Sequence, residues 1–136
     1  MADTSQTRFE ALSRLKTLDQ FIPARTAVAP HTEALRQFDR RSNTWERISY
    51  RDLSERIMVW RRAFAKLGLK RGDRVAILLP NGVDSVCCDQ AVLANGYVPV
   101  PLHAIDTAGS SAYIIADSEA KVLVTTRQNR WDSIYL

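Results

Sequence analysis

The sequence predicts an α/β protein: an incomplete doubly wound parallel sheet that is preceded by a β-hairpin. Residues 75–79 form a continuous apolar run, which is typical of a strand buried on both faces of a parallel sheet. Two more short strand-like segments, 97–100 and 121–126, follow it, with a helical pattern in each interval. Earlier in the chain, residues 34–38 and 45–48 have the pattern of two short strands around a polar turn.

Residues 1–33 are expected to form a leader with helical pieces. Its apolar residues recur at helical spacing, and two prolines are expected to interrupt them; the apolar set is Phe9, Leu12, Leu15, Leu18, Phe21 and Ile22, and the prolines are Pro23 and Pro30. The hairpin follows at residues 34–48, with residues 39–43 as its turn.

The clearest helical pattern covers residues 50–67. Its apolar residues follow one another at intervals of four and three, which makes one stripe: Leu53, Ile57, Trp60, Phe64 and Leu67. Ser49 is a good N-cap, and Asp52 lies where a loose capping box needs an acceptor. Gly68 is placed to end the helix with left-handed backbone. The charged residues lie mostly off the stripe, so a solvated face is favoured over a functional basic patch.

A turn at residues 71–73 leads into the apolar run. Its sequence is Arg-Gly-Asp, and the turn explains this tripeptide better than a cell-adhesion motif does. Residues 80–82 end the strand, and a second helix is predicted over residues 84–95, closed by Gly96. One face of that helix collects Val83, Val86, Cys87, Ala91 and Ala94. Cys87 is therefore predicted to be a core residue and not a nucleophile.

The last predicted elements complete the alternation of strands and helices. Residues 101–106 form a loop, and Thr107 or Ser110 caps a short helix that ends at about Asp117. Strand 121–126 follows, and residues 131–136 have the pattern of a helix cut short in its first turn. The order strand, helix, strand, helix, strand implies crossovers and parallel pairing. A sheet of three strands with open edges suggests part of a larger domain.

Composition excludes several classes of protein. The 136 residues fit one domain; 46% are hydrophobic, 25% are charged, and the net charge is +4. The basic residues are spread along the chain, so no nucleic-acid partner is expected. There is no apolar run long enough for a transmembrane segment and no signal-peptide core, so we expect a cytoplasmic protein. Adjacent Cys87 and Cys88 do not suit a structural disulfide. His31 and His103 have no metal-ligand spacing.

The loops that follow parallel strands are where such folds bind ligands. They are residues 80–82, 101–103 and 125–127, and none is a phosphate-binding loop. No combination of Ser, His and acid suggests nucleophilic catalysis. His103 is the most interesting titratable group, but a structural or solvent-facing role is favoured. Asp84 and Asp106 are interpreted as cap or turn residues. No residue is assigned a catalytic, cofactor-binding or metal-ligating role.

Four segments resemble a known family in the same order. Residues 45–53 look like its first core motif, with Asp52 where Glu is usual, and residues 67–82 are close to its next run. Residues 91–102 look like its second core motif, with Asn95 where many members have Ala; residues 112–124 match the following helix and strand. The chain thus resembles the N-terminal region of the AMP-forming adenylating enzymes, which include acyl-CoA synthetases, luciferases and peptide-synthetase adenylation domains.

This resemblance implies the N-terminal subdomain of the adenylate-forming fold. Residues 1–33 would be the leader, and residues 34–136 a partial α/β domain truncated at its C-terminal end. The parent would join a carboxylate to AMP, release pyrophosphate and pass the acyl group to coenzyme A. ATP, magnesium and coenzyme A are expected for that parent and none for this chain, because the family's catalytic motifs lie beyond Leu136. The chain alone would be an inactive scaffold whose partner is the remainder of the same polypeptide.

Residues 98–107 look most like long-chain fatty acyl-CoA synthetases of bacterial type, so a fatty acid is the favoured carboxylate. Two other interpretations stay open. One is a stand-alone binding or regulatory module of α/β fold. The other is a Rossmann-type nucleotide-binding domain, against which the lack of a glycine-rich turn after residues 75–79 argues.

Overall fold

The computed structural model describes residues 12–103, 105–126 and 132. They fall into two compact units that divide after Glu55, and each unit is considered by itself. Helix α3 (Tyr50–Ala65) begins in the first unit and ends in the second. The expected leader residue Phe9 and most of the expected helix start at 131–136 lie outside the described residues.

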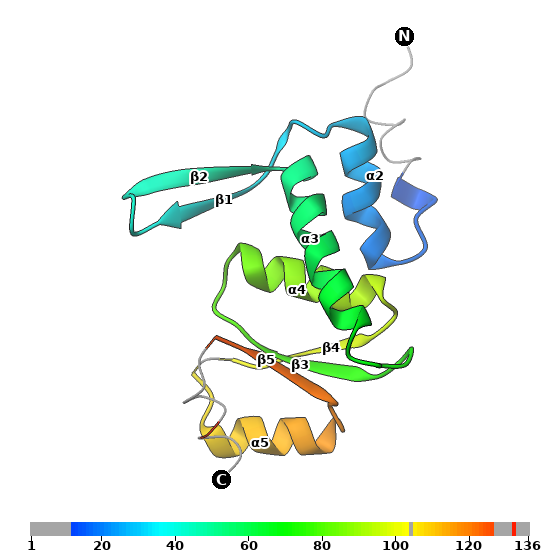
Figure 1. Cartoon of the computed structure of the whole chain (residues 1–136), viewed down its shortest axis with the longest axis vertical. Helices are drawn as coiled ribbons and strands as arrows, with labels where there is room; N and C mark the ends of the chain where they lie inside the picture. Colours follow the sequence, from blue (N-terminus) through cyan, green and yellow to red (C-terminus); the bar gives the residue numbers. More distant parts are fainter. Residues whose placement is uncertain (1–11, 104, 127–131, 133–136) are drawn as a thin grey trace. The chain divides into compact units, whose positions relative to one another are not determined.

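The first unit opens with two short helical elements, the 3-10 helix η1 (Leu18–Gln20) and helix α2 (Phe21–Val28), shown in Figure 1. The expectation that Pro23 interrupts the helical pattern is wrong. Pro23 is the third residue of α2, where a backbone N–H has no partner within the helix, so its missing donor costs nothing there. Thr26 ties α2 to the start of α3, because its hydroxyl lies 2.9 Å from the Ser54 hydroxyl.

The predicted hairpin is confirmed as strands β1 (Glu33–Asp39) and β2 (Thr44–Ser49), paired antiparallel. Asp39 organises the turn, since its carboxylate accepts hydrogen bonds from the Arg41 N–H at 2.9 Å and the Ser42 hydroxyl at 2.7 Å. Phe38 lies opposite Trp45, with 5.4 Å between the ring centroids in an edge-to-face arrangement.

Helix α3 begins with the predicted capping box. The Ser49 hydroxyl accepts the Asp52 N–H at 3.2 Å, and the Asp52 carboxylate accepts the Ser49 N–H at 3.1 Å. The apolar stripe is only partly buried: Leu53, Ile57 and Phe64 are buried, whereas Trp60 is half-buried. Leu67 is 54% exposed, against expectation, because the helix ends at Ala65 and Leu67 lies in the turn before Gly68.

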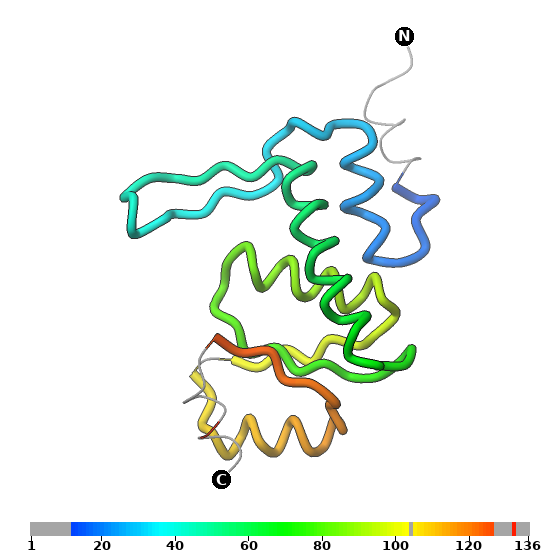
Figure 2. Tube along the Cα trace, viewed as in Figure 1, coloured from blue at the N-terminus to red at the C-terminus, as the bar shows by residue number. Residues whose placement is uncertain are grey.

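The second unit is built on a parallel sheet of three strands, as predicted. The strands are β3 (Arg74–Leu78), β4 (Val98–Pro101) and β5 (Val122–Thr125), and β3 lies between the other two. Both pairings are parallel. Figure 2 traces the chain from green β3 through yellow β4 to orange β5, with a helix in each connection.

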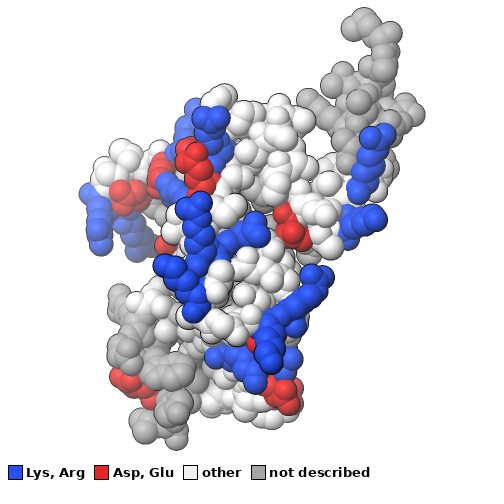
Figure 3. All heavy atoms as spheres, turned by 45° about the vertical axis from the view of Figure 1, so that its right-hand side comes forward, with Lys and Arg blue, Asp and Glu red and all other residues white. Residues whose placement is uncertain are grey.

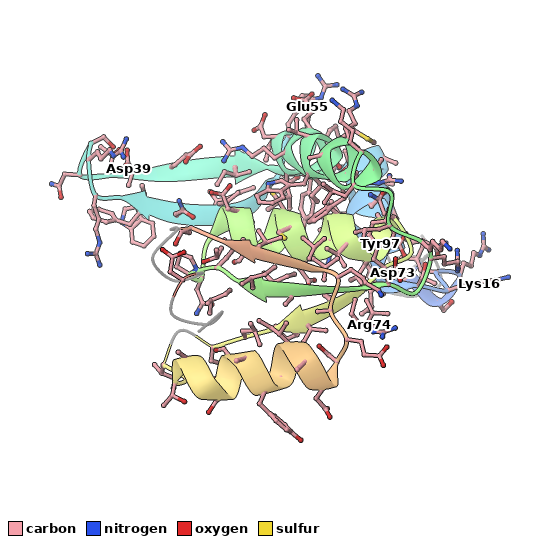
Figure 4. The ribbon with its side chains drawn as sticks, turned by 60° about the horizontal axis from the view of Figure 1, so that its bottom comes forward. Lys16, Asp39, Glu55, Asp73, Arg74 and Tyr97 are labelled. Carbon is pink, nitrogen blue, oxygen red and sulfur yellow. The ribbon has the colours of Figure 1, made fainter. Side chains whose placement is uncertain are left out.

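Helices α4 (Val83–Ala94) and α5 (Ala108–Asp117) cover opposite faces of this sheet (Figure 4). On the α5 side, Ala76, Leu78 and Leu102 are buried against Ile114 and Ile115. On the other side, the buried residues of α4 are Val83, Cys87, Cys88, Ala91 and Val92. Cys87 is thus a core residue, as predicted. The predicted face was wrong at Val86 and Ala94, which are half-buried, because the buried face includes the next positions around the helix, Cys88 and Val92.

The Arg-Gly-Asp tripeptide forms the predicted turn into β3. Gly72 has a φ of +86°, a conformation that favours glycine, and its N–H donates to the Gly96 carbonyl at 2.8 Å. The Asp73 carboxylate accepts the Lys70 N–H at 2.8 Å. The second and third residues of the tripeptide, Gly72 and Asp73, therefore serve the turn itself.

Candidate functional site

The carboxyl ends of β3, β4 and β5 meet at one edge of the sheet, because all three strands run in the same direction. Residues 79–82 follow β3, Leu102 and His103 follow β4, and Thr126 follows β5. Ligands of open α/β sheets bind outside this edge. The structure thus brings together the loops that the sequence singled out, apart from Arg127, which lies outside the described residues.

The start of α4 uses its own polar groups for capping. The Ser85 hydroxyl accepts the Gly82 N–H at 3.1 Å and donates to the Gly82 carbonyl at 2.8 Å. Asp84 lies exposed in the first turn, where a carboxylate interacts favourably with the helix dipole. This supports the interpretation of Asp84 as a helix-terminus residue, and its negative charge opposes an anion at that place.

The loop after β4 is closed by Asp106. Its carboxylate accepts the His103 N–H at 3.3 Å, and its own N–H donates to the His103 carbonyl at 3.1 Å. Asp106 is therefore a turn residue, as interpreted from the sequence. Thr107 is the N-cap of α5, and its hydroxyl accepts the Ser110 N–H at 3.1 Å. The His103 side chain is exposed.

Thr125, at the end of β5, carries a buried hydroxyl at this edge. Its oxygen is shielded from solvent and has no hydrogen-bond partner within the part of the chain that the structure describes. An unsatisfied buried hydroxyl costs roughly 1–3 kcal/mol. The sequence placed Thr125 at a strand end, but the burial of its oxygen depends on packing and carries no local signal.

The opposite, amino end of the sheet carries an ion pair between Arg74 and Glu119. Arg74 begins β3, and its guanidinium donates to the Ser118 carbonyl at 2.6 Å and to the Glu119 carboxylate at 2.7 Å. Figure 4 shows Asp73, Arg74 and Tyr97 at this amino end. In the view of Figure 3, Lys and Arg side chains lie interspersed with Asp, Glu and uncharged residues. Arg74, the cation of β3, therefore lies at the end of the strand away from the edge where a phosphate ligand would lie.

The two cysteines have no features of a nucleophile. Both thiols are free and fully buried within α4. Burial, with a smaller contribution from the Asp84 charge, raises the pKa of Cys87 to about 11. Burial and the Asp89 charge raise the pKa of Cys88 to about 12. Since the thiolate is the reactive form, neither side chain is activated at neutral pH.

Among residues 12–103, 105–126 and 132, no group of three or more His, Cys, Asp and Glu side chains is arranged to hold a metal ion. Within the same residues, no helix has the length and apolar character needed to cross a membrane.

Comparison with known proteins gives one matching family and relatives within it. Residues 23–134 match the family described as "AMP-binding enzyme". The long-chain-fatty-acid–CoA ligase FadD13 of Mycobacterium tuberculosis is 27% identical over 110 residues, which cover 81% of this chain and 21% of the ligase. A crotonobetaine/carnitine–CoA ligase of Salmonella typhimurium is 35% identical over 80 residues, which cover 59% of this chain and 16% of the ligase.

A solved structure shows the same fold. The inhibitor-bound N-terminal domain of FACL13 from Mycobacterium tuberculosis superposes with a TM-score of 0.71 at 27% identity, over 80% of this chain and 26% of that one. In the two ligases, the segments that match this chain make up only 21% and 16% of the whole length.

Proposed function

Because the chain belongs to the AMP-binding enzyme family, we propose that it is the N-terminal scaffold of a longer carboxylate–CoA ligase. The family match runs from the leader helix α2 through β5 and thus includes every strand of both sheets. In this proposal residues 34–136 belong to the ligase's N-terminal α/β domain, and residues 1–33 precede it as a leader.

The proposed reaction of the longer protein has two steps. A carboxylate oxygen attacks the α-phosphorus of ATP, so that acyl-AMP forms and pyrophosphate leaves. The thiol of coenzyme A then attacks the acyl carbon, so that acyl-CoA forms and AMP leaves. The first step must hold a triphosphate and stabilise negative charge on the departing pyrophosphate.

The described residues do not fit ATP or magnesium. At the carboxyl edge, the polar groups that begin α4 and α5 are already used as caps, and the charged side chains there are the carboxylates Asp84 and Asp106. The cation of β3 is Arg74, which lies at the amino end of the strand, away from this edge, and forms an ion pair with Glu119. We therefore assign no catalytic, cofactor-binding or metal-ligating role to this chain, and we expect it to be inactive alone.

We propose a long-chain fatty acid as the carboxylate. The similarity to the long-chain-fatty-acid–CoA ligase extends over 81% of the chain, against 59% for the crotonobetaine/carnitine–CoA ligase, although the second match has the higher identity. A fatty acid is long and apolar, whereas carnitine is small and charged, so the test compares these two substrates.

The test is ATP–pyrophosphate exchange, measured on the 136-residue chain and on the full-length protein with magnesium. Fatty acids of increasing length and carnitine are supplied in parallel, with chelated magnesium as the control. We expect exchange from the full-length protein with long fatty acids and none from the chain alone. Exchange by the chain would refute the scaffold role, exchange with carnitine alone would correct the substrate, and a full-length protein that exchanges with no acid would overturn the proposal.

A further inference from the structure

The chain contains two Asn-Gly dipeptides, Asn81-Gly82 and Asn95-Gly96. In such a dipeptide the backbone nitrogen of the glycine can attack the side-chain carbonyl carbon of the asparagine, and no Cβ on the glycine hinders the approach. The reaction needs an asparagine side chain that can turn toward the next backbone nitrogen. It also needs that nitrogen to be released from any hydrogen bond. The two dipeptides differ in both respects.

The Asn95-Gly96 dipeptide is held at each of its reacting groups. Arg61 binds the Asn95 side chain at its oxygen, at 3.1 Å, and at its nitrogen, at 2.9 Å. The Gly96 N–H donates to the Leu93 carbonyl at 2.9 Å, among the backbone bonds that close α4. Reaction at Asn95 therefore requires the end of this helix to open, with the loss of all these bonds.

The Asn81-Gly82 dipeptide, in the loop between β3 and α4, is held much less. The Asn81 side chain is exposed, and the residues that the structure describes offer it no hydrogen-bond partner. The Gly82 N–H donates to a side chain, the Ser85 hydroxyl, at 3.1 Å. A serine side chain can rotate to another staggered position about its Cα–Cβ bond. The Gly82 nitrogen can therefore be released while helix α4 stays intact.

We propose that Asn81 is a site of spontaneous deamidation in the folded protein and that Asn95 is not. The Gly82 nitrogen loses its proton to hydroxide and attacks the Asn81 side-chain carbonyl carbon. The new C–N bond closes a cyclic imide, and the side-chain nitrogen takes a proton from water and leaves as ammonia. Water then opens either carbonyl of the imide, which yields aspartate or isoaspartate. The product carries a new carboxylate three residues before Asp84, beside the amino end of α4, where the helix dipole favours negative charge.

The test follows both asparagines in the full-length protein during incubation at pH 8. Mass spectrometry of proteolytic peptides detects the mass gain that occurs when the side-chain NH2 is replaced by OH. We expect the product at Asn81 to form at least about 10-fold faster than the product at Asn95, because Asn95 reacts only after local opening. In urea, where both dipeptides are unstructured, the two rates should be similar. Ser85→Ala frees the Gly82 N–H and should speed the reaction at Asn81 alone, whereas Ser85→Thr keeps the hydroxyl and should not.

The comparison of two asparagines in one molecule decides the proposal, whatever the activity of the protein. Equal rates in the folded protein, or a product at Asn81 that forms only in urea, would overturn it. A rise at both asparagines in Ser85→Ala would mean that this variant unfolds, and would contradict the release of Gly82 alone. Gly82→Ala is an independent variant, since its added Cβ lies beside the attacking nitrogen and should slow the reaction at Asn81 without changing Asn95. An unchanged rate at Asn81 in that variant would rule out the Gly82 nitrogen as the attacking group.

Discussion

Arg61 and Asn95 hold each other through hydrogen bonds in both directions. The Arg61 Nε donates to the Asn95 side-chain oxygen at 3.1 Å, and the Asn95 amide donates to the Arg61 backbone carbonyl at 2.9 Å. A further bond runs from the Arg61 guanidinium to the Ala94 carbonyl at 3.4 Å. Together they join the last turns of α3 and α4 within the second unit. Asn95 is also the residue that departs from the resemblance at the second core motif.

Asn95→Ala should therefore destabilise the protein, although alanine is common there in the family that the chain resembles. We expect a loss of about 1–3 kcal/mol in the free energy of unfolding, because a partly buried guanidinium loses its acceptor. Urea titration measures the change. Arg62→Ala, at the exposed neighbouring arginine, is the control and should have little effect. Equal effects of the two substitutions would show that the pairing contributes nothing.

Phe64 and Leu67 belong to one predicted stripe but should respond differently to truncation. Phe64 is 3% exposed, so Phe64→Ala should cost about 3–5 kcal/mol. Leu67 is 54% exposed, so Leu67→Ala should stay within about 0.5 kcal/mol of the parent. Trp60→Ala should fall between them, since Trp60 is half-buried with its ring centroid 6.0 Å from that of Phe64. A large loss at Leu67 would contradict this helix end.

The buried thiols should make the protein less stable in mild alkali. The pKa of Cys87 is about 11 and that of Cys88 about 12 in the folded chain, above the ordinary value of 9.0. Between pH 9 and pH 11 the unfolded chain loses thiol protons that the folded chain keeps, so stability falls as pH rises. Urea midpoints at pH 8 and pH 10 measure this fall. In the double variant Cys87→Ala/Cys88→Ala, the fall in urea midpoint from pH 8 to pH 10 should be smaller, even if the variant is less stable at pH 8. A fall as large as that of the parent would show that groups other than the two thiols cause it.

Gly96 and Gly109 should respond to alanine with opposite signs. Gly96 has a φ of +77°, and an added Cβ would lie 3.2 Å from the Arg71 Cγ. Gly96→Ala should therefore cost about 1–2 kcal/mol. Gly109 lies in the first turn of α5, where an added Cβ would meet only the Thr107 Oγ1 at 3.9 Å. Gly109→Ala should stabilise by about 0.5–1 kcal/mol. Thermal unfolding of both variants compares them directly.

The sheet was predictable because parallel strands leave a strong local signal. Burial on both faces requires consecutive apolar residues, and residues 75–79 and, more briefly, 122–124 carry such runs. The hairpin was predictable for a similar reason, since its polar turn separates two strand-like segments. In each case the tertiary environment is reflected in the composition of a few adjacent residues.

The errors arose where a residue's position within an element decides its role. Pro23 breaks a helix in its interior but is accepted in its first turn, and the pattern does not tell where the turn begins. Leu67 fits the periodicity of α3, yet periodicity continues past the end of the helix. At the candidate site, the sequence showed which loops meet. It did not show which of their polar groups already form hydrogen bonds as helix caps or turn residues. Ser85 could be recognised as a cap only from its bonds to Gly82.

The order of the strands in the sheet has a consequence during synthesis. Strand β3 is made first and lies in the middle, and its second partner β5 begins only at Val122. At translation rates of roughly 5–20 residues per second, the apolar β3 segment waits for several seconds on the ribosome before both of its edges are paired. During that interval the nascent chain exposes a strand suited to aggregation, which makes chaperone protection most valuable before Thr125 has emerged.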